Sequence, residues 1–360
     1  MANVRHDDGA PLRVALLGYG LGGAAFHAPF IATVSALELA VIVTGNPERQ
    51  AQAAHDHPGA RIVSDASRVW EQKGEVDVAV ISTPNRTHVP LALSAIRAGL
   101  HVVVDKPLAP SSAEARVVAN AAREHGVVLA PFQNRRWDGD FLTVRRLLAD
   151  GALGEPLRFE SRFERWRPVP TGSWREGGSP EDAGGLLFDL GSHLVDQALM
   201  LFGPAREVYA ELERRREGVA ADDDTFVALA HASGVRSHLW MSAVTAQPGP
   251  RFRLSGMRGA FTKWGLDVQE AALRAGERPG GPDWGAESAE HWGVVRVDDV
   301  ERTVPTERGD YGAFYRQLTR SIRFGEPPPV EPNDISSALE VIEAARESSG
   351  RGVVVRLRSR

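Results

Sequence analysis

An apolar hexapeptide that leads directly into a glycine-rich loop constrains the fold of this chain more than any other feature. Residues 12–17 read LRVALL, and three glycines follow with the spacing G-x-G-x-x-G. In that spacing the first glycine permits a tight strand-to-helix turn, the second lets a pyrophosphate approach the backbone, and the third lets the helix pack on the strand. Glycine-rich turns of purely structural role are common, but the strand before the loop and the helical stretch after it favour dinucleotide binding. The predicted cofactor-binding residues of the loop are Gly18, Tyr19, Gly20, Leu21 and Gly23.

The first third of the chain alternates short apolar segments with helical stretches. Val- and Ile-rich segments without polar alternation are typical of a parallel sheet that is covered on both faces. The alternation implies right-handed crossovers, so we predict an α/β fold that begins with a doubly wound Rossmann domain over residues 1–131. The predicted strands are 12–17, 38–43, 76–81, 101–104 and 127–130, and the predicted helices are 23–35, 47–56, 66–72, 87–98 and 111–125.

The pattern changes after about residue 132, where strands with a period near two begin. This alternation predicts a C-terminal α+β domain over residues 132–360, with a large, mostly antiparallel open sheet that binds substrate and mediates oligomerisation. The expected strands are 157–165, 206–213, 225–231, 236–243 and 353–355, the expected helices are 138–150, 186–202, 310–323 and 333–347, and 274–292 reads as a long loop. We expect the helix at about 333–347 to pack back on the first domain.

Several apolar side chains of the second-domain strands need a covering surface, namely Phe159, Phe163, Leu239 and Trp240. Some of them must pack on helices of their own chain. The apolar side chains that no helix covers predict a subunit interface, and therefore a homodimer or homotetramer.

The composition excludes several classes of partner and chemistry. The 360 residues carry a net charge of −5, which leaves no basic excess to neutralise a nucleic acid or an anionic membrane. There is no cysteine, so disulfides and thiol nucleophiles are excluded. Residues 1–11 read as a polar, disordered tail without the apolar core of a signal peptide, and no apolar run reaches the roughly 18 residues of a membrane span. We expect a cytoplasmic protein.

Polar residues follow two of the predicted parallel strands, where ligands of open α/β sheets bind. Thr83, Pro84 and Asn85 come after the strand 76–81, although the same residues also favour an ordinary turn. Asp105 and Lys106 come after the strand 101–104. A cation there can stabilise alkoxide character on a substrate oxygen, with Asp105 holding Lys106 in place, whereas the alternative is a solvated surface lysine.

A third candidate group lies on the helix predicted over 186–202. Asp189 and His193 are four residues apart and therefore share a face, and Asp196 lies near it. An imidazole is the natural general base for a hydroxyl proton near neutral pH. A capping histidine or a metal pair are the alternatives, and we predict no metal because no further cluster of His or carboxylate residues lies nearby in the sequence. A dinucleotide fold, a lysine in the crevice and this histidine together predict an oxidoreductase that interconverts an alcohol and a carbonyl.

With these motifs, nearly the whole chain resembles the glucose-fructose oxidoreductase / inositol dehydrogenase / MocA (Gfo/Idh/MocA) oxidoreductases. The family usually has Glu-Lys-Pro where this chain has Asp105-Lys106-Pro107, a change that keeps the carboxylate. The resemblance rests on the glycine loop, on Ser82-Thr83-Pro84-Asn85-x-x-His88, on 99–109, on 185–196, and on the closing segments 314–316 and 325–330.

The resemblance implies roles for individual residues. Lys106 and His193 would carry proton transfer, and Asp189 would position the substrate. Lys106 would also bridge the reacting oxygen and the cofactor ribose, and His88 and Asp105 would belong to the cofactor site. Residues 132–138 and 189–197 look most like those of NADP-dependent scyllo-inositol dehydrogenases. That likeness places Arg136, Trp137 and Asp138 near the substrate pocket.

The residues after the second predicted strand bear on the choice of cofactor. NAD enzymes of this fold usually place a carboxylate there to bind the ribose 2′-hydroxyl, but this chain has Thr44, Asn46 and Arg49. Arg49 can pair with a 2′-phosphate, so we predict NADP over NAD.

The stretch 164–176 contains Arg165, Trp166, Arg167, Trp174 and Arg175, whose rings and guanidinium groups would suit a polyhydroxylated substrate. Packing beneath a long loop is the alternative for this stretch.

We therefore predict an NADP-dependent dehydrogenase acting on a cyclitol or a sugar. Two alternatives are a regulator that senses sugar or NADP without catalysis, and a redox-neutral enzyme of the same fold.

Overall fold

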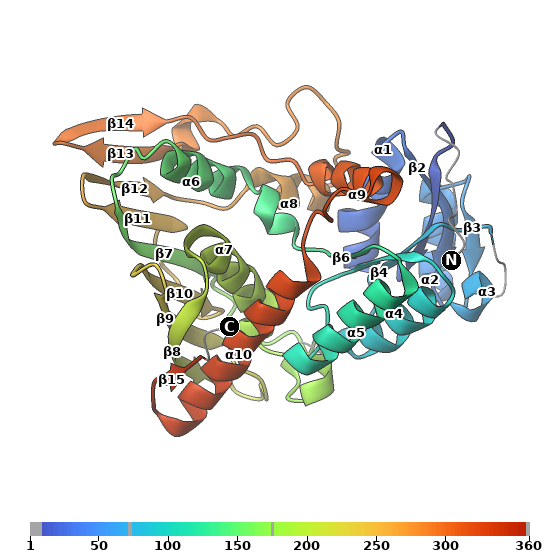
Figure 1. The fold of residues 1–360 in the computed structure, drawn as a ribbon, viewed down its shortest axis with the longest axis horizontal. Helices are drawn as coiled ribbons and strands as arrows, with labels where there is room; N and C mark the ends of the chain where they lie inside the picture. Colours follow the sequence, from blue (N-terminus) through green and yellow to red (C-terminus); the bar gives the residue numbers. More distant parts are fainter. Residues whose placement is uncertain (1–8, 71–73, 174–175, 358–360) are drawn as a thin grey trace.

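The computed structural model describes residues 9–70, 74–173 and 176–357, which form two sheets with helices around and between them (Figure 1). Most of the tail predicted at 1–11 lies outside these residues, as do Trp174 and Arg175. No helix in the described ranges is long and apolar enough to cross a membrane.

The first sheet has six parallel strands in the order β3-β2-β1-β4-β5-β6, which confirms the predicted Rossmann fold. Its inner strands are almost entirely buried because helices cover both faces, whereas the edge strand β3 is partly exposed. The sequence analysis missed only β3, whose three residues are too few for a periodic pattern. The strands are β1 (Leu12–Leu17), β2 (Leu37–Val43), β3 (Arg61–Val63), β4 (Val78–Ile81), β5 (His101–Val104) and β6 (Leu129–Pro131).

Helix termini in this half follow local sequence signals. The helix α2 (Pro47–Asp56) begins with proline, and the Asn46 side chain accepts a hydrogen bond from the Arg49 backbone N–H at 3.0 Å. The helix α5 (Ser112–His125) ends at Gly126, which adopts the left-handed conformation with φ of 67°. The remaining helical segments are η1 (Gly22–His27), α1 (Ala28–Thr33), α3 (Ser67–Trp70), η2 (Asn85–Thr87) and α4 (His88–Arg97).

The second sheet has nine strands in the order β14-β13-β12-β11-β7-β10-β9-β8-β15. Only β7 and β10 pair in parallel, so the predicted, mostly antiparallel open sheet is confirmed. The sequence analysis missed the short strands β11 to β14. The strands are β7 (Pro156–Glu164), β8 (Ala205–Glu213), β9 (Asp224–His231), β10 (Arg236–Ser242), β11 (Phe252–Gly256), β12 (Gly259–Lys263), β13 (Gly293–Val297), β14 (Val300–Val304) and β15 (Val355–Arg356).

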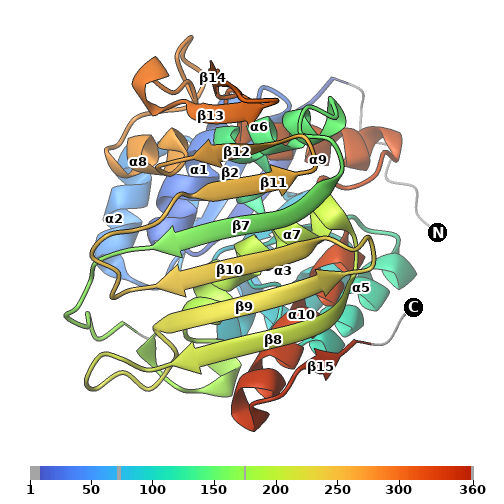
Figure 2. The same cartoon turned by 90° about the vertical axis from the view of Figure 1, so that its left-hand side faces the viewer.

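Helices cover one face of this sheet and leave the other open, as Figure 2 shows. Phe159, Phe163 and Leu239 point to the covered face and are fully buried, whereas Trp240 lies on the open face. The helical segments of this half are η3 (Asn134–Trp137), α6 (Gly139–Ala149), η5 (Pro180–Asp182), η6 (Leu187–Gly191), α7 (Ser192–Phe202), α8 (Val268–Arg274), η7 (Ala289–His291), α9 (Gly312–Phe324) and α10 (Pro332–Arg351).

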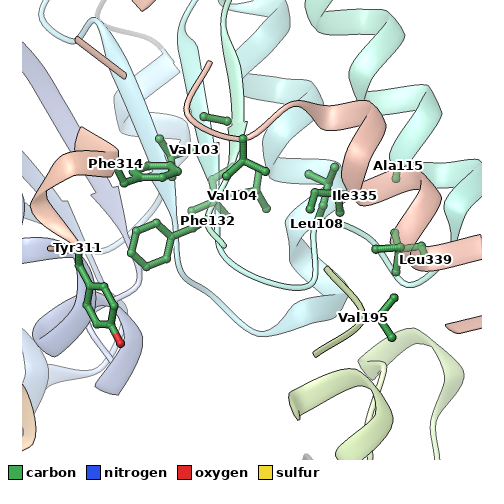
Figure 3. Close-up of a cluster of buried hydrophobic side chains, with 14 of the residues drawn as sticks. Val103, Val104, Leu108, Ala115, Phe132, Val195, Tyr311, Phe314, Ile335 and Leu339 are labelled. Atoms are coloured by element: carbon green, nitrogen blue, oxygen red, sulfur yellow. The ribbon is translucent and has the colours of Figure 1, made fainter. Parts of the chain in front are cut away.

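The long helix α10 connects the two sheets. Its Glu343 carboxylate accepts hydrogen bonds from the backbone N–H and the hydroxyl of Ser112 at the start of α5, at 2.6 and 2.9 Å. Its Glu340 pairs with Arg116 at 2.6 Å. Apolar side chains complete the junction, where Phe132 and Val104 lie between Phe314 of α9 and Ile335 of α10 (Figure 3). This buried cluster joins the two halves along the edge of the crevice.

Candidate active site

A cleft of about 380 Å³ lies between the glycine loop, the end of β5 and the second sheet. It brings together side chains that are far apart in the sequence. The residues that line it include Leu21, Gly22, Asp105, Lys106, Arg135, Arg165, Asp189, His193 and Glu270.

The glycine loop is closed so tightly that it admits no side chain at two positions. Gly18 has φ of 98°, and a Cβ there would collide with the Ser82 carbonyl at the end of β4. A Cβ on Gly23 would collide with the Gly18 carbonyl. These constraints fit a loop whose backbone faces a pyrophosphate, with the helix packed directly behind it. The side chain of Tyr19 turns away and donates a hydrogen bond to Asp56 at 3.0 Å.

The first turn of α2, which follows β2, places a cation beside the glycine loop. The Arg49 guanidinium lies 3.6 Å from the position that a Cβ on Gly20 would occupy. Thr44 is buried, and the Asn46 side chain caps α2. Arg49 is therefore the group of this predicted set that is placed to meet an anionic substituent beside the loop.

The predicted group at 83–88 uses its side chains mainly to brace loops. The Asn85 amide donates to the Asp182 carbonyl of the second half at 2.7 Å. Both ring nitrogens of His88 lie 2.8 Å from backbone carbonyls, those of Pro107 and Thr83. Thr83 and Pro84 come one residue after β4, beyond Ser82. None of these residues lines the cleft, so Asn85 and His88 hold its walls in place instead.

Lys106 and Asp189 meet inside the cleft although they belong to different halves. The Lys106 Nζ donates to the backbone carbonyl and to the Oδ1 of Asp189, both at 2.6 Å. The Asp105 carboxylate accepts from the Lys106 backbone N–H at 2.8 Å instead of binding the ammonium group. Asp189 thus holds the Lys106 side chain, a role that the sequence analysis had given to Asp105.

His193 lies at the same cleft and is held by a residue that the sequence analysis did not select. Its Nδ1 donates to the Gln133 Oε1 at 2.8 Å, which leaves Nε2 as the unprotonated nitrogen of the neutral ring. Burial, together with the positive charges of Lys106, Arg135 and Arg251, lowers the pKa of His193 well below its ordinary value. The ring is therefore a neutral proton acceptor at pH 7.

Three residues predicted near the substrate pocket do not line the cleft. The Arg136 guanidinium is buried and binds both carboxylate oxygens of Asp196, at 2.8 and 2.6 Å. Trp137 packs edge-on against Phe314, and Asp138 accepts a hydrogen bond from the Tyr311 hydroxyl at 2.6 Å. Arg136, Trp137 and Asp138 are placed to support the site from behind.

Their neighbours Phe132, Asn134 and Arg135 line the cleft instead, and Arg135 pairs there with Glu270. The short turn η3 directs successive side chains to different sides, so the pattern could not distinguish Arg135 from Arg136. Similarly, Trp166 is 58% exposed and does not line the cleft, whereas the adjacent Arg165 does.

No group of three or more metal-ligating side chains occurs within the described ranges. The cleft instead combines a glycine loop, a lysine held by a carboxylate, and a neutral histidine. This set suits proton transfer to and from a hydroxyl beside a bound dinucleotide.

Comparisons with known proteins support this interpretation. Residues 12–133 match the model of the oxidoreductase family with an NAD-binding Rossmann fold, GFO_IDH_MocA, and residues 141–262 match the GFO/IDH/MocA C-terminal domain. The chain is 34% identical to scyllo-inositol 2-dehydrogenase (NADP(+)) IolW of Bacillus subtilis over 94% of both chains. It is 40% identical to the oxidoreductase YdgJ of Escherichia coli over 94% of this chain and 96% of that one. The solved structure of the oxidoreductase yvaA from Bacillus subtilis has a TM-score of 0.92, at 32% identity, over 97% of this chain and 99% of that one.

Proposed function

The chain belongs to the Gfo/Idh/MocA family of NAD(P)-dependent oxidoreductases, and we propose that it is an NADP-dependent dehydrogenase that interconverts a hydroxyl and a carbonyl group on a cyclitol or a sugar. One relative, IolW, carries scyllo-inositol and NADP(+) in its name, at 34% identity over nearly the full length. A polyol of that class is the substrate that we propose first.

The observation that carries this proposal is the meeting of Lys106, Asp189 and His193 in one cleft beside the glycine loop. A nicotinamide dinucleotide, when bound, supplies the hydride acceptor or donor. The Lys106 ammonium donates to the substrate oxygen and stabilises the negative charge that develops on it. The unprotonated Nε2 of His193 takes the hydroxyl proton, and Gln133 holds the ring in that tautomer. Asp189 orients Lys106 through its Oδ1.

The direct test is the initial rate of reduction of NADP and of NAD with inositols, aldoses and sugar acids. We expect turnover with scyllo-inositol or a related polyol and a higher kcat/KM with NADP. Tight NADP binding without turnover of any polyol would contradict the dehydrogenase assignment and favour a sensor. A cofactor that stays bound through purification and returns unchanged after each turnover would favour redox-neutral chemistry.

Removing the Arg49 guanidinium is expected to reduce the preference for NADP. A charge-assisted contact of this kind corresponds to roughly a 10- to 100-fold change in affinity. We therefore expect Arg49→Ala to raise the Kd for NADP by that factor and to leave the Kd for NAD almost unchanged. Titration by tryptophan fluorescence measures both constants, and Arg97→Ala, an exposed change on α4, serves as the control. Equal weakening for both cofactors would contradict the role of Arg49.

We also propose that a second copy of the chain covers the open face of the large sheet, in a homodimer or homotetramer. Trp240 lies there with its ring centroid 5.1 Å from that of Phe226 and with the Arg162 guanidinium 3.9 Å above its ring. Trp240→Arg should shift the protein toward monomer in sedimentation at micromolar concentration. Phe324→Arg, at a more exposed apolar residue on α9, should not. A wild-type monomer at this concentration would refute the proposal.

A further inference from the structure

A buried histidine outside the predicted set connects the second half of the chain to the site at the end of β5. His27, at the end of η1, is fully buried beneath Phe132, with ring centroids 4.2 Å apart. Its Nδ1 lies 2.5 Å from the Tyr315 hydroxyl of α9. Its Nε2 lies 3.5 Å from the Oδ2 of Asp105. The ring therefore stands between a residue of α9 and the carboxylate that precedes Lys106.

The direction of the hydrogen bonds follows from the chemistry of the tyrosine. Burial, reinforced by the negative charge of Asp105, raises the pKa of Tyr315 well above its ordinary value, so the hydroxyl keeps its proton. We assign the hydroxyl as the donor to Nδ1, with the ring proton on Nε2. Nε2 is buried and has no closer acceptor within the described residues, so its N–H dipole faces Asp105.

The Asp105 carboxylate occupies a central place at the cleft. Its Oδ2 accepts a hydrogen bond from the Ser82 hydroxyl at 3.0 Å, and its Oδ1 accepts from the Lys106 backbone N–H at 2.8 Å. Gly22 of the glycine loop lies next to the same Oδ2, since a Cβ on Gly22 would come within 2.9 Å of it. Because Gly22 has no side chain, the Asp105 carboxylate stays open to the cleft that it lines. Movement of this side chain would therefore move the backbone that carries Lys106.

We propose that His27 and Tyr315 are positioning residues of the active site: Tyr315 fixes the tautomer of His27, and the Nε2–H of His27 holds the Asp105 carboxylate in place beside Lys106. This inference rests on the proposed role of Lys106. Neither residue touches the space where a substrate would bind, so both act through Asp105.

The charge state of Asp105 supports the same arrangement. Burial opposes its negative charge, but the contact with His27 and the electrostatic influence of His27, His88 and Lys106 outweigh that cost and hold the pKa of Asp105 below its ordinary value. Tyr315 is the other titratable group that faces it. Loss of the His27 N–H removes one of the interactions that favour the carboxylate, so the pKa of Asp105 would rise.

The test compares His27→Leu, which removes the N–H, with His27→Gln, whose amide can replace it at the Nε2 position. With NADP and the best polyol of the panel, we expect His27→Leu to lower kcat roughly 10-fold with little change in KM. We expect His27→Gln to recover most of this loss and Tyr315→Phe to fall between the two. The acid limb of the kcat profile should move to higher pH in His27→Leu, because Asp105 then protonates more readily.

Phe314→Leu is the matched control, because Phe314 belongs to the same aromatic cluster but makes no polar contact to His27. It should lower stability while leaving kcat and its pH profile unchanged. A His27→Leu enzyme with wild-type kcat would overturn the proposal. So would a His27→Gln enzyme as impaired as His27→Leu, since the effect would then be one of packing.

A second measurement does not depend on turnover. Urea unfolding of His27→Leu, Asp105→Asn and the double variant, without cofactor, gives the coupling between the two side chains. We expect the loss of unfolding free energy in His27→Leu to be smaller on the Asp105→Asn background, because no carboxylate is then left without the His27 contact. Additive losses would overturn the coupling. A wild-type protein that neither binds NADP nor oxidises a polyol would instead overturn the proposed function, whatever the unfolding cycle shows.

Discussion

Replacing Lys106 with methionine is expected to lower kcat by roughly 100- to 1,000-fold, the usual cost of losing one donor to a developing oxyanion. Methionine keeps the length and apolar stem of the side chain but has no ammonium group to donate to the substrate oxygen. The glycine loop and Arg49 are unchanged, so the Kd for NADP should stay close to the wild-type value. Stopped-flow turnover and fluorescence titration of the same preparation measure the two quantities.

Lys106→Arg is the control for charge alone. Its planar guanidinium keeps the positive charge beside Asp189 but does not reproduce the position of a compact ammonium group. We expect partial activity, above that of Lys106→Met and well below wild type. A Lys106→Met enzyme that turns over at a rate near that of the wild type would remove Lys106 from the mechanism.

His193→Asn is expected to lower kcat for polyol oxidation by roughly 100- to 10,000-fold, the range for losing a general base. The asparagine amide can still donate to the Gln133 Oε1, as Nδ1 does now at 2.8 Å. It has no basic nitrogen in the place of Nε2, so the change removes the proton acceptor and keeps the anchoring contact. Gln133→Leu is the complementary variant. It keeps the His193 imidazole but removes the acceptor that holds the proton on Nδ1, so its loss of kcat should be smaller.

The pH profile gives an independent check on His193. Its pKa is lowered by burial and by the cations around it, so the neutral, active form persists as the pH falls below the ordinary imidazole value of about 6.5. Oxidation by the wild-type enzyme should therefore show no loss that is centred on that pH. An acid limb centred there, still present in His193→Asn, would mean that another group is the base.

The local patterns of the sequence were enough to predict the Rossmann half, because they depend on neighbouring residues. Gly18 and Gly23 stand where any side chain would collide with backbone, so their spacing requires a strand, a turn and a helix. Pro47 and Asn46 likewise mark the start of α2, because both residue types are favoured at a helix N-terminus. The short strands β11 to β14 carried no comparable signal, since strands of five residues leave little room for a period.

The residues of the candidate site differ in the same way in how far they could be predicted. Lys106 and His193 were selected from the sequence because each follows or occupies an element whose position in the fold was predictable. Arg136, Trp137 and Asp138 were selected by likeness alone. The structure turns them away from the cleft and puts Arg135 there, since one step along the tight turn η3 changes the direction of a side chain.

Periodicity and glycine sterics were therefore enough to predict the dinucleotide-binding fold, the open mixed sheet and the residue types available for chemistry. Which side chains meet depends instead on how the elements pack in three dimensions. Lys106 and Asp189 are 83 residues apart, His193 and Gln133 are 60 apart, and His27 and Tyr315 are 288 apart. No local pattern encodes such pairs, because they form only where η6 and α7 pack beside η3 and β10, and where α9 packs on α1 and η3.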